Sequence, residues 1–337
     1  MTETIRLSHG FGGERTQDLI DEIIHPALSG DKNHKVTLDA AVLNNLESPV
    51  VVSTDSYTIT PRFFPGGDIG KLAVAGTIND ILMMGAKAKF LSLGLIIEEG
   101  FKIEELRIIM ESIGDTCRKT DTKVVTGDTK VVEKGIIDGI FINTTGFGTQ
   151  VHEPIGPEFI REGDAILISG TIGDHGAAIL NARENLGFSQ TILSDCAPLN
   201  EMIAKVEAAA GKNLHAMRDP TRGGIAASLN EFAIDTDLQF AIEEDKLPVL
   251  PEVKSFLEIL GLDLFTLANE GKALLFVAPE AVYAALSALH DDPNGKKASV
   301  IGRVEKALKK GRVIMETVIG THRIIQMPLE TGLPRIC

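Results

Sequence analysis

The 337-residue chain has no tryptophan, two tyrosines and three cysteines, and it contains no long uninterrupted apolar run. Its apolar segments, such as residues 90–97, have the length of a strand, and the N-terminus begins with polar and acidic residues. We therefore expect neither a membrane span nor a secretory leader. Cys117, Cys196 and Cys337 form neither a CxxC pair nor an even set, which favours reduced thiols and a cytoplasmic location.

Basic residues are scarce as well, because 33 Lys and Arg face 47 Asp and Glu and give a net charge of −14. A nucleic-acid surface needs clustered positive charge, so binding to nucleic acid is not expected. The sequence also lacks a GxxxxGK[ST] loop and the protein-kinase motifs. If ATP is bound, Asp residues must hold it through Mg²⁺, a cation that prefers carboxylate and phosphate oxygens.

What is present is a globular composition, with 44% hydrophobic residues and a length that suits two domains. The first predicted domain covers residues 1–150 and alternates strands with helices. Its strands are expected near 36–43, 49–58, 89–97, 123–127 and 137–148, and its helices near 14–24, 69–85 and 103–119.

A connector containing proline and glycine around 152–163 leads into a second domain, 151–327. Its elements do not form a regular βαβ series, which predicts an α+β (mixed α/β) fold. Strands are expected near 165–169, 239–243, 264–268, 272–278 and 298–303, and helices near 173–187, 198–210 and 223–234. Residues 328–337 form a tail whose Gly332 and Pro334 oppose a helix, so we expect it to be mobile.

Several aspartates stand where they can hold a ligand. Asp39 and Asp55 lie at or near the ends of apolar strands, although turn formation explains either one alone. Asp80 lies in the segment 72–85, which reads as a helix that is apolar on nearly every side. A buried carboxylate must find a cation or hydrogen-bond donors, so a metal, an arginine or a backbone amide each accounts for Asp80.

Three loops carry further candidates. The turn at 126–130 contains Asp128 and Lys130 and suits either a phosphate or metal contact or a surface hairpin. The loop 218–224 brings two arginines and the start of a helix together, as an anion site or a helix cap does. Glu270 lies between two apolar segments, in a tight turn or as a placed carboxylate.

Cys337 is the final residue of the sequence. The ten residues after Met327 can span about 33 Å when extended, far enough to bring the thiol into a cleft. A thiol is a nucleophile once deprotonated, and an inert tail is the alternative. Cys117 and Cys196 lie in or beside apolar segments and are expected to be packing residues.

Taken together, these motifs resemble the HypE family of hydrogenase maturation proteins over nearly the whole chain. That family belongs to the superfamily of aminoimidazole ribonucleotide synthetase (PurM) and selenophosphate synthetase, and the ending Pro-Arg-Ile-Cys distinguishes it from those relatives. Phe11 departs from the pattern, since a small residue is expected there. The resemblance rests on residues 8–13, 39–41, 53–55, 79–86, 127–130, 218–224, 269–271 and 334–337.

The resemblance implies a two-domain PurM-like fold in which the N-terminal domain binds ATP and pairs with its copy in a homodimer. It further implies that a HypF-like carbamoyltransferase loads a carbamoyl group onto Cys337. The protein would then dehydrate the thiocarboxamide to a thiocyanate with ATP, and a HypC–HypD-like iron complex would receive the cyanide for a [NiFe] hydrogenase. The alternatives are an ATP-dependent synthetase that acts on a free small amide and leaves Cys337 idle, and a nucleotide-binding scaffold without turnover.

The resemblance also implies roles for single residues. Cys337 would carry the substrate, and Glu270 or Lys130 would be the base. The implied Mg²⁺ ligands are Asp39, Asp55, Asp80 and Asp219, with Asp128 as an additional one. The implied nucleotide contacts are Gly10, Gly12, Gly13, Thr54, Asn79, Asp80, Asp128 and Lys130.

Overall fold

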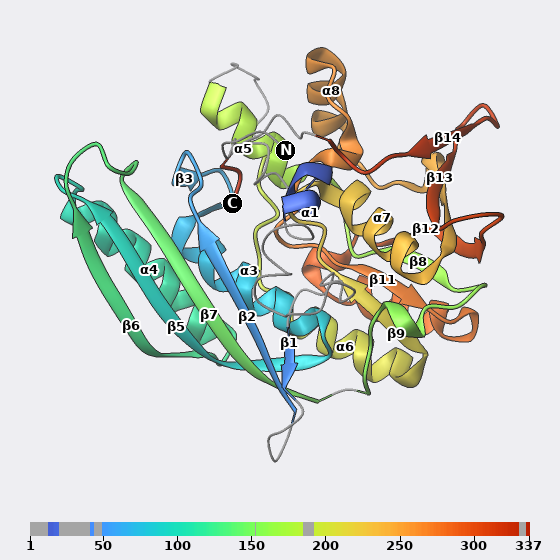
Figure 1. Ribbon diagram of the computed structural model, residues 1–337, viewed down its shortest axis with the longest axis horizontal. Coiled ribbons are helices and arrows are strands. Elements are labelled where there is room, and N and C mark those ends of the chain that lie inside the picture. The colour runs from blue at the N-terminus through green and yellow to red at the C-terminus, as the bar shows by residue number, and fades with distance from the viewer. Residues whose placement is uncertain (1–12, 20–40, 44–48, 152, 185–191, 330–334) are drawn as a thin grey trace.

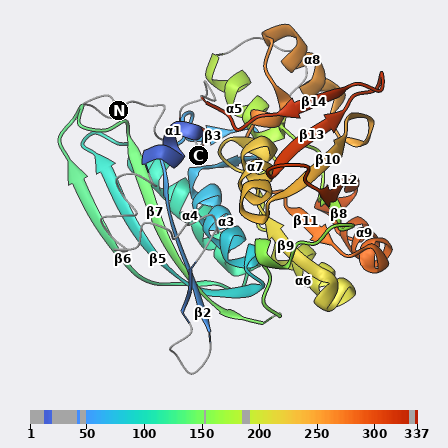
Figure 2. The ribbon, with the colours of Figure 1, turned by 45° about the vertical axis from the view of Figure 1, so that its right-hand side comes forward.

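The computed structural model describes residues 13–19, 41–43, 49–151, 153–184, 192–329 and 335–337. Two β-sheets lie side by side, and helix α3 passes between them (Figure 1). The same arrangement is seen after a 45° turn (Figure 2). The mixed α/β fold class predicted from the sequence is confirmed.

The N-terminal sheet has five strands in the order β1-β2-β7-β5-β6. Strand β2 pairs antiparallel with β7, β7 pairs antiparallel with β5, and β5 pairs parallel with β6, which is an edge strand among the described residues. The elements of this half are α1 (Glu14–Leu19), β1 (Ala41–Leu43), β2 (Val50–Tyr57), β3 (Phe63–Phe64), β4 (Gly67–Asp68), α3 (Ile69–Met83), β5 (Ala86–Glu98), α4 (Ile103–Lys119), β6 (Lys123–Val132) and β7 (Ile140–Gln150).

Helix α3 is buried on almost every side, as its apolar sequence predicts. All its residues except Lys71 and Asp80 are buried. Its N-terminus is capped by Asp68, whose carboxylate accepts the amides of Gly70 at 2.7 Å and Lys71 at 3.1 Å. One side of α3 packs on β2, β5 and β7, and the other contacts α6 and β9 of the second half. The helix is therefore shared by both domains.

The C-terminal sheet has seven strands in the order β14-β13-β10-β12-β8-β11-β9. Successive residues of β8 face different cores, since Ile166 and Ile168 pack in one cluster with α7 and Leu167 packs in the other with α6 and α9. The elements are β8 (Ala165–Ile168), α5 (Asp174–Glu184), α6 (Asn200–Ala210), β9 (Leu214–Arg218), α7 (Gly224–Thr236), β10 (Leu238–Glu243), α8 (Pro251–Leu260), β11 (Leu274–Val277), α9 (Val282–His290), β12 (Ser299–Lys306), β13 (Arg312–Glu316) and β14 (His322–Ile325).

Two local predictions are wrong. The segment 264–268, predicted as a strand, contains a 3₁₀ turn at Leu264–Thr266 whose first amides are met by Asp263. The segment 126–130, predicted as a turn, lies inside β6 because its backbone pairs continuously with β5. Cys117 and Cys196 are buried packing residues, as predicted. No helix in the described ranges is long and apolar enough to cross a membrane.

Candidate functional site

Four acidic residues gather where the two domains meet. Asp55 lies near the end of β2, Asp80 lies on α3, Asp219 follows β9, and Glu270 lies in the loop before β11. They are near enough for their charges to act on one another, because the charges of Asp55 and Asp219 both raise the pKa of Glu270. The cluster combines the strand-end positions and the buried helix that the sequence singled out.

Glu270 is the most perturbed of the four. Its side chain is 3% exposed, and its Oε1 has no hydrogen-bond partner among the described residues. Burial raises the pKa of Glu270 well above its usual range, the charges of Asp219, Asp195 and Asp55 raise it further, and Arg222 opposes them. A carboxyl group in such a place binds a proton readily, which is the property required of a general base.

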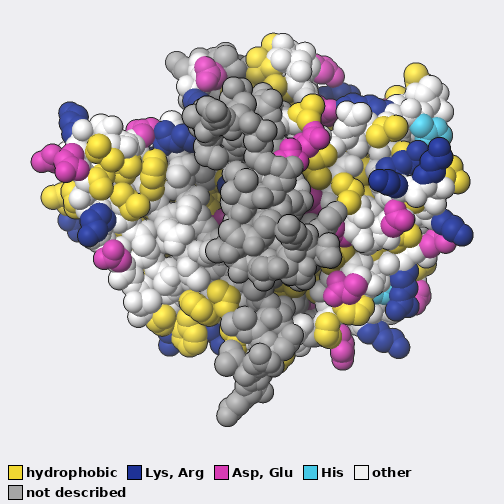
Figure 3. All heavy atoms as spheres, viewed as in Figure 1, with side chains coloured by type: hydrophobic (Ala, Val, Ile, Leu, Met, Phe, Trp, Pro, Cys, Tyr) yellow, Lys and Arg dark blue, Asp and Glu magenta, His cyan; other side chains and the backbone are white. Residues whose placement is uncertain are grey.

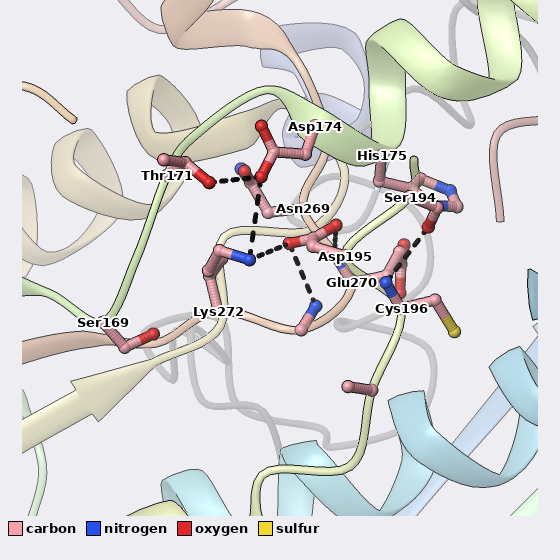
Figure 4. A network of polar contacts seen from close by, with 12 residues as sticks. Ser169, Thr171, Asp174, His175, Ser194, Asp195, Cys196, Asn269, Glu270 and Lys272 are labelled. Carbon is pink, nitrogen blue, oxygen red and sulfur yellow. Dashed lines mark hydrogen bonds and ion pairs between the residues drawn. The ribbon is translucent and has the colours of Figure 1, made fainter. Parts of the chain in front are cut away.

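A buried ionic network fixes the backbone that carries Glu270 (Figure 4). The carboxylate of Asp195 accepts the amide N–H of Glu270 at 3.1 Å and that of Gly271 at 3.3 Å. The Lys272 ammonium lies 3.2 Å from Asp195 and 3.9 Å from Asp174. Burial, followed by the Asp195 charge, raises the pKa of Asp174 to about 6 against the opposing charge of Lys272.

Asn79 holds the same loop from the other domain. Its side-chain amide donates to the carbonyl of Ala197 at 3.1 Å and to that of Glu270 at 3.4 Å, and its oxygen accepts the amide of Leu199 at 2.9 Å. The side chain is 1% exposed, so these contacts consume it. Asn79 therefore has a structural function at the domain junction, and the nucleotide contact implied for it stays a prediction.

Asp55 and Arg222 form the opposite wall of the cluster. The guanidinium of Arg222 lies 3.7 Å from Asp55 Oδ1, and the hydroxyl of Tyr57 donates to Asp55 Oδ2 at 3.3 Å. Burial nevertheless raises the pKa of Asp55, although Arg222 and Tyr57 both lower it. Asp80 accepts the Ser53 hydroxyl at 2.5 Å.

Cys337 lies inside this cluster. Its carbonyl accepts the Thr58 amide at 3.1 Å, and the Arg335 carbonyl accepts the Thr60 amide at 3.3 Å, so the last three residues pair with the segment that continues β2. Burial raises the pKa of the Cys337 thiol to about 12; Arg222 opposes this, and Glu270 with the two nearby aspartates adds to it. The docked thiol is therefore protonated at neutral pH. The mobility expected of the tail stays a prediction.

Other implied site residues lie away from the cluster within one chain. Asp128 and Lys130 are exposed on β6, in register with Gly94 and Ile96 of the exposed face of β5, so Lys130 is not the buried lysine that the sequence suggested. Strand β6 is also three strands from β2, a separation of about 14 Å. Thr54 faces away from the cluster and bonds to Thr145.

The glycine-rich segment is only partly visible. Gly13 packs against the Pro328 backbone so closely that a Cβ there would lie 1.9 Å from the Pro328 oxygen. Gly10, Gly12 and Asp39 lie outside the described residues. No group of three or more His, Cys, Asp or Glu in the described part of the chain is arranged to hold a metal ion.

Sequence reasoning missed the residues that support the cluster, notably Asp195, Lys272, His175 and Arg183. Buried charges of this kind persist only in pairs, and the partners come from distant parts of the chain. The one available signal was that Lys272 follows the acidic loop at 269–271 directly.

Two family models match the chain. The N-terminal domain of AIR synthase related proteins matches residues 38–150, and the C-terminal domain of the same proteins matches residues 161–314. Among curated relatives, carbamoyl dehydratase HypE of Bradyrhizobium diazoefficiens is 45% identical over 99% of this chain and 96% of its own length. Carbamoyl dehydratase HypE of Escherichia coli K12 is 42% identical over 99% of each.

Solved structures give the same result. A HypE–HypF complex contains a chain 43% identical to this one, with a TM-score of 0.86, covering 92% of this chain and 99% of that chain. HypE in complex with ATP is 41% identical with a TM-score of 0.83, covering 99% and 100%. Thiamine monophosphate kinase from Aquifex aeolicus, 18% identical with a TM-score of 0.66 over 90% and 97%, shares the fold. The chain therefore belongs to the HypE family of carbamoyl dehydratases, within the AIR synthase related proteins.

Proposed function

We propose that this protein uses ATP to dehydrate an S-carbamoyl group on Cys337 to a thiocyanate, which supplies cyanide for the iron of a [NiFe] hydrogenase. The observation that carries the proposal is the docking of Cys337 among Glu270, Asp55 and Asp219. A group attached to the sulfur enters a buried acidic cleft next to a carboxyl group whose Oε1 is unpartnered among the described residues.

The reaction needs two chemical steps. The amide oxygen is a poor leaving group, so its attack on the γ-phosphate of ATP, with loss of one N–H proton, gives ADP and an O-phosphorylated imidate. Removal of the second nitrogen proton and cleavage of the C–O bond then release phosphate and leave S–C≡N. The net change is the loss of one water from the thiocarboxamide. A base must therefore reach the tethered nitrogen.

Glu270 suits that role. Its raised pKa makes it a stronger base than an exposed carboxylate, and Asp195 and Asn79 fix its backbone from two sides. The docked thiol has a pKa of about 12 and is a poor nucleophile there. We infer that loading of the carbamoyl group takes place with the tail withdrawn, in the active site of a HypF-like carbamoyltransferase.

Mg²⁺ fits the same cluster. Asp55 and Asp219 raise the pKa of Glu270, which means that the cluster holds more negative charge than Arg222 offsets. Carboxylate oxygens are the ligands that Mg²⁺ prefers, so Asp55, Asp80 and Asp219 would hold it, together with Asp39. When bound, the ion would neutralise phosphate charge next to the tethered amide.

We propose a HypC–HypD-like iron complex as the acceptor of the cyanide. The chemistry also requires Cys337 as a free thiol before loading, and all three cysteines are free. We therefore place the protein in the cytoplasm, where thiols stay reduced. A synthetase acting on a free amide would leave Cys337 idle, whereas here the tail occupies the place of such a substrate.

A homodimer would give Asp128 and Lys130 a function. The outer face of the N-terminal sheet exposes Phe90, Ile96 and Phe147, with 44%, 42% and 37% of their surface accessible. Figure 3 shows hydrophobic side chains on this side of the sheet. We propose that a second copy covers this face. The edge strand β6 of one copy would then contribute its exposed Asp128 and Lys130 to the cleft of the other.

The central prediction concerns mass. After incubation with a HypF-like enzyme, carbamoyl phosphate and MgATP, the intact protein should gain a thiocyanate, one water lighter than the carbamoyl adduct. Cys337→Ala should gain neither group, and Glu270→Gln should accumulate the carbamoyl or phosphorylated form because the base is lost. An adduct on Cys117 or Cys196, or unimpaired conversion by Glu270→Gln, would contradict the assignment.

The raised pKa of Glu270 predicts a pH-dependent stability. As pH rises past about 4.3, the unfolded chain loses this proton before the folded protein does, so the wild type loses stability until the folded pKa is passed. Glu270→Gln escapes this loss and should be more stable at pH 8 by on the order of 1–3 kcal/mol.

Thermal melting between pH 4.5 and 8, without nucleotide or metal, measures this difference. The gap between Glu270→Gln and wild type should widen as pH rises, and the exposed Glu280→Gln should melt like wild type. A variant that is less stable than wild type at every pH would show that Glu270 is not strained by burial.

Asp80→Asn tests the metal assignment. A neutral amide is a weak Mg²⁺ ligand but keeps the size of the side chain, so ATP affinity should fall about tenfold or more in Mg²⁺ while the melting temperature stays similar. Calorimetric titration with ATP, with and without Mg²⁺, measures both terms. Equal Mg²⁺-dependent affinity in the variant and wild type refutes the assignment.

Mixed dimers test the contribution of Lys130. When Lys130→Ala and Glu270→Gln chains are mixed in equal amounts, random pairing gives about a quarter of the sites an intact Glu270 and the partner copy's intact lysine. Thiocyanate should then form on the Lys130→Ala chain, identified by its mass. If Lys130 acts within its own chain, no mixed dimer has a complete site and no thiocyanate forms.

A further inference from the structure

The docked end of the chain exposes a requirement that a strand pairing alone cannot meet. Residues 335 and 337 pair with Thr60 and Thr58, so alternate carbonyls of the tail point toward that segment. The carbonyl of Ile336 lies between them and points away from it. Ile336 is 6% exposed, and a buried carbonyl without a donor is costly.

His175 supplies the missing donor. Its Nε2 lies 2.7 Å from the Ile336 oxygen, and its Nδ1 lies 2.7 Å from the hydroxyl oxygen of Ser194. A carbonyl can only accept, so Nε2 must carry the proton and Nδ1 must accept from Ser194. Ser194 in turn accepts the amide of Cys196 at 3.0 Å, which fixes the direction of its own hydroxyl.

The imidazole is held ready for this contact by its surroundings. His175 is fully buried on α5, and the Phe64 ring lies edge-on to it, with centroids 5.6 Å apart. Burial lowers the pKa of His175, which keeps the ring neutral with one N–H available. Figure 4 shows His175 and Ser194 beside the segment that leads through Asp195 toward Glu270.

Helix α5 also contacts the tail near its other end. Arg183 donates through Nη2 to the Arg335 carbonyl at 2.7 Å and through Nε to the Thr60 carbonyl at 2.9 Å. Arg335 itself has a positive φ of 55° and bonds to Asp138 at 2.7 Å. Both contacts act at residue 335, two positions before the cysteine, whereas His175 acts on the residue directly before it.

We propose that His175 is a positioning residue that receives the Ile336 carbonyl and thereby sets the sulfur of Cys337 beside Glu270. The inference rests on the proposed function, because that function explains why the sulfur must be placed. A displacement of about 1 Å at the reacting centre can lower a rate about a hundredfold, so a fixed point one residue away is effective.

Alkylation of the full-length protein tests this position without any carbamoyl chemistry. Iodoacetamide modifies Cys337 when the tail is undocked, so the rate reports the undocked fraction, and Cys117 and Cys196 serve as internal reports of the fold. His175→Leu should raise the Cys337 rate about tenfold, because a buried carbonyl loses its donor. His175→Gln, whose amide nitrogen can still donate, should stay within about threefold of wild type.

Two further variants sharpen the comparison. His290→Leu removes a similar imidazole, which lies 3.0 Å from the Ala298 carbonyl away from the tail, and should leave Cys337 at the wild-type rate. Ser194→Ala frees the tautomer of His175 and should raise the Cys337 rate about threefold. If His175→Leu also exposes Cys196, the contrast between His175→Gln and Ser194→Ala decides.

Protection of Cys337 that is equal in the Leu, Gln and wild-type proteins would overturn the proposal, as would equal loss in Leu and Gln. The proposed function can fail separately. If no thiocyanate forms but the alkylation order is Leu, then Ser194→Ala, then Gln and wild type, the positioning role of His175 stands and the chemistry does not. Thiocyanate formation with no effect of His175 on alkylation would support the chemistry and refute the positioning role.

Discussion

The site depends on one side-chain amide that spans the two domains. Asn79 leaves the buried helix α3 of the N-terminal half and bonds to three backbone groups of the C-terminal half, one of which is the carbonyl of Glu270. Because all these groups are buried, losing the amide would leave them unsatisfied at once. The relative position of the domains and the position of the catalytic carboxyl group are thus set by the same contacts. A cleft between domains usually allows relative motion, but this one is fixed at its base.

The buried charges around the cleft are divided between two roles. Asp195 is stabilised by Lys272 and by two backbone amides, so it can remain ionised in a buried place and hold the loop. Glu270, one residue from that anchored turn, is left without a comparable partner and has a raised pKa. Two neighbouring carboxyl groups are thereby given different properties, one for structure and one for proton transfer.

Much of this could be predicted from the sequence, and the failures have physical causes. Helix α4 is predicted at its observed bounds because its apolar residues repeat with the helical period. The clustering of Asp55, Asp80, Asp219 and Glu270 followed from motif positions. The prediction for strand β6 is wrong because Gly127 and Asp128 are turn formers locally, while pairing with β5 overrides that preference. The contact between His175 and the tail could not be predicted, since no pattern links a helix start to a residue so far away in the chain.

The backbone of Arg335 gives the docked tail a further property. A side-chain-bearing residue in the left-handed region is strained by roughly 1 kcal/mol, and only the surrounding contacts keep it there. That strain is relieved whenever residues 335–337 leave the cleft, so it offsets part of the attraction from the hydrogen bonds and the buried Ile336. The tail then behaves as a latch with a spring: it closes into a defined position, yet its opening is helped by its own backbone. Such a balance suits a substrate that must be delivered, processed and handed on by the same three residues.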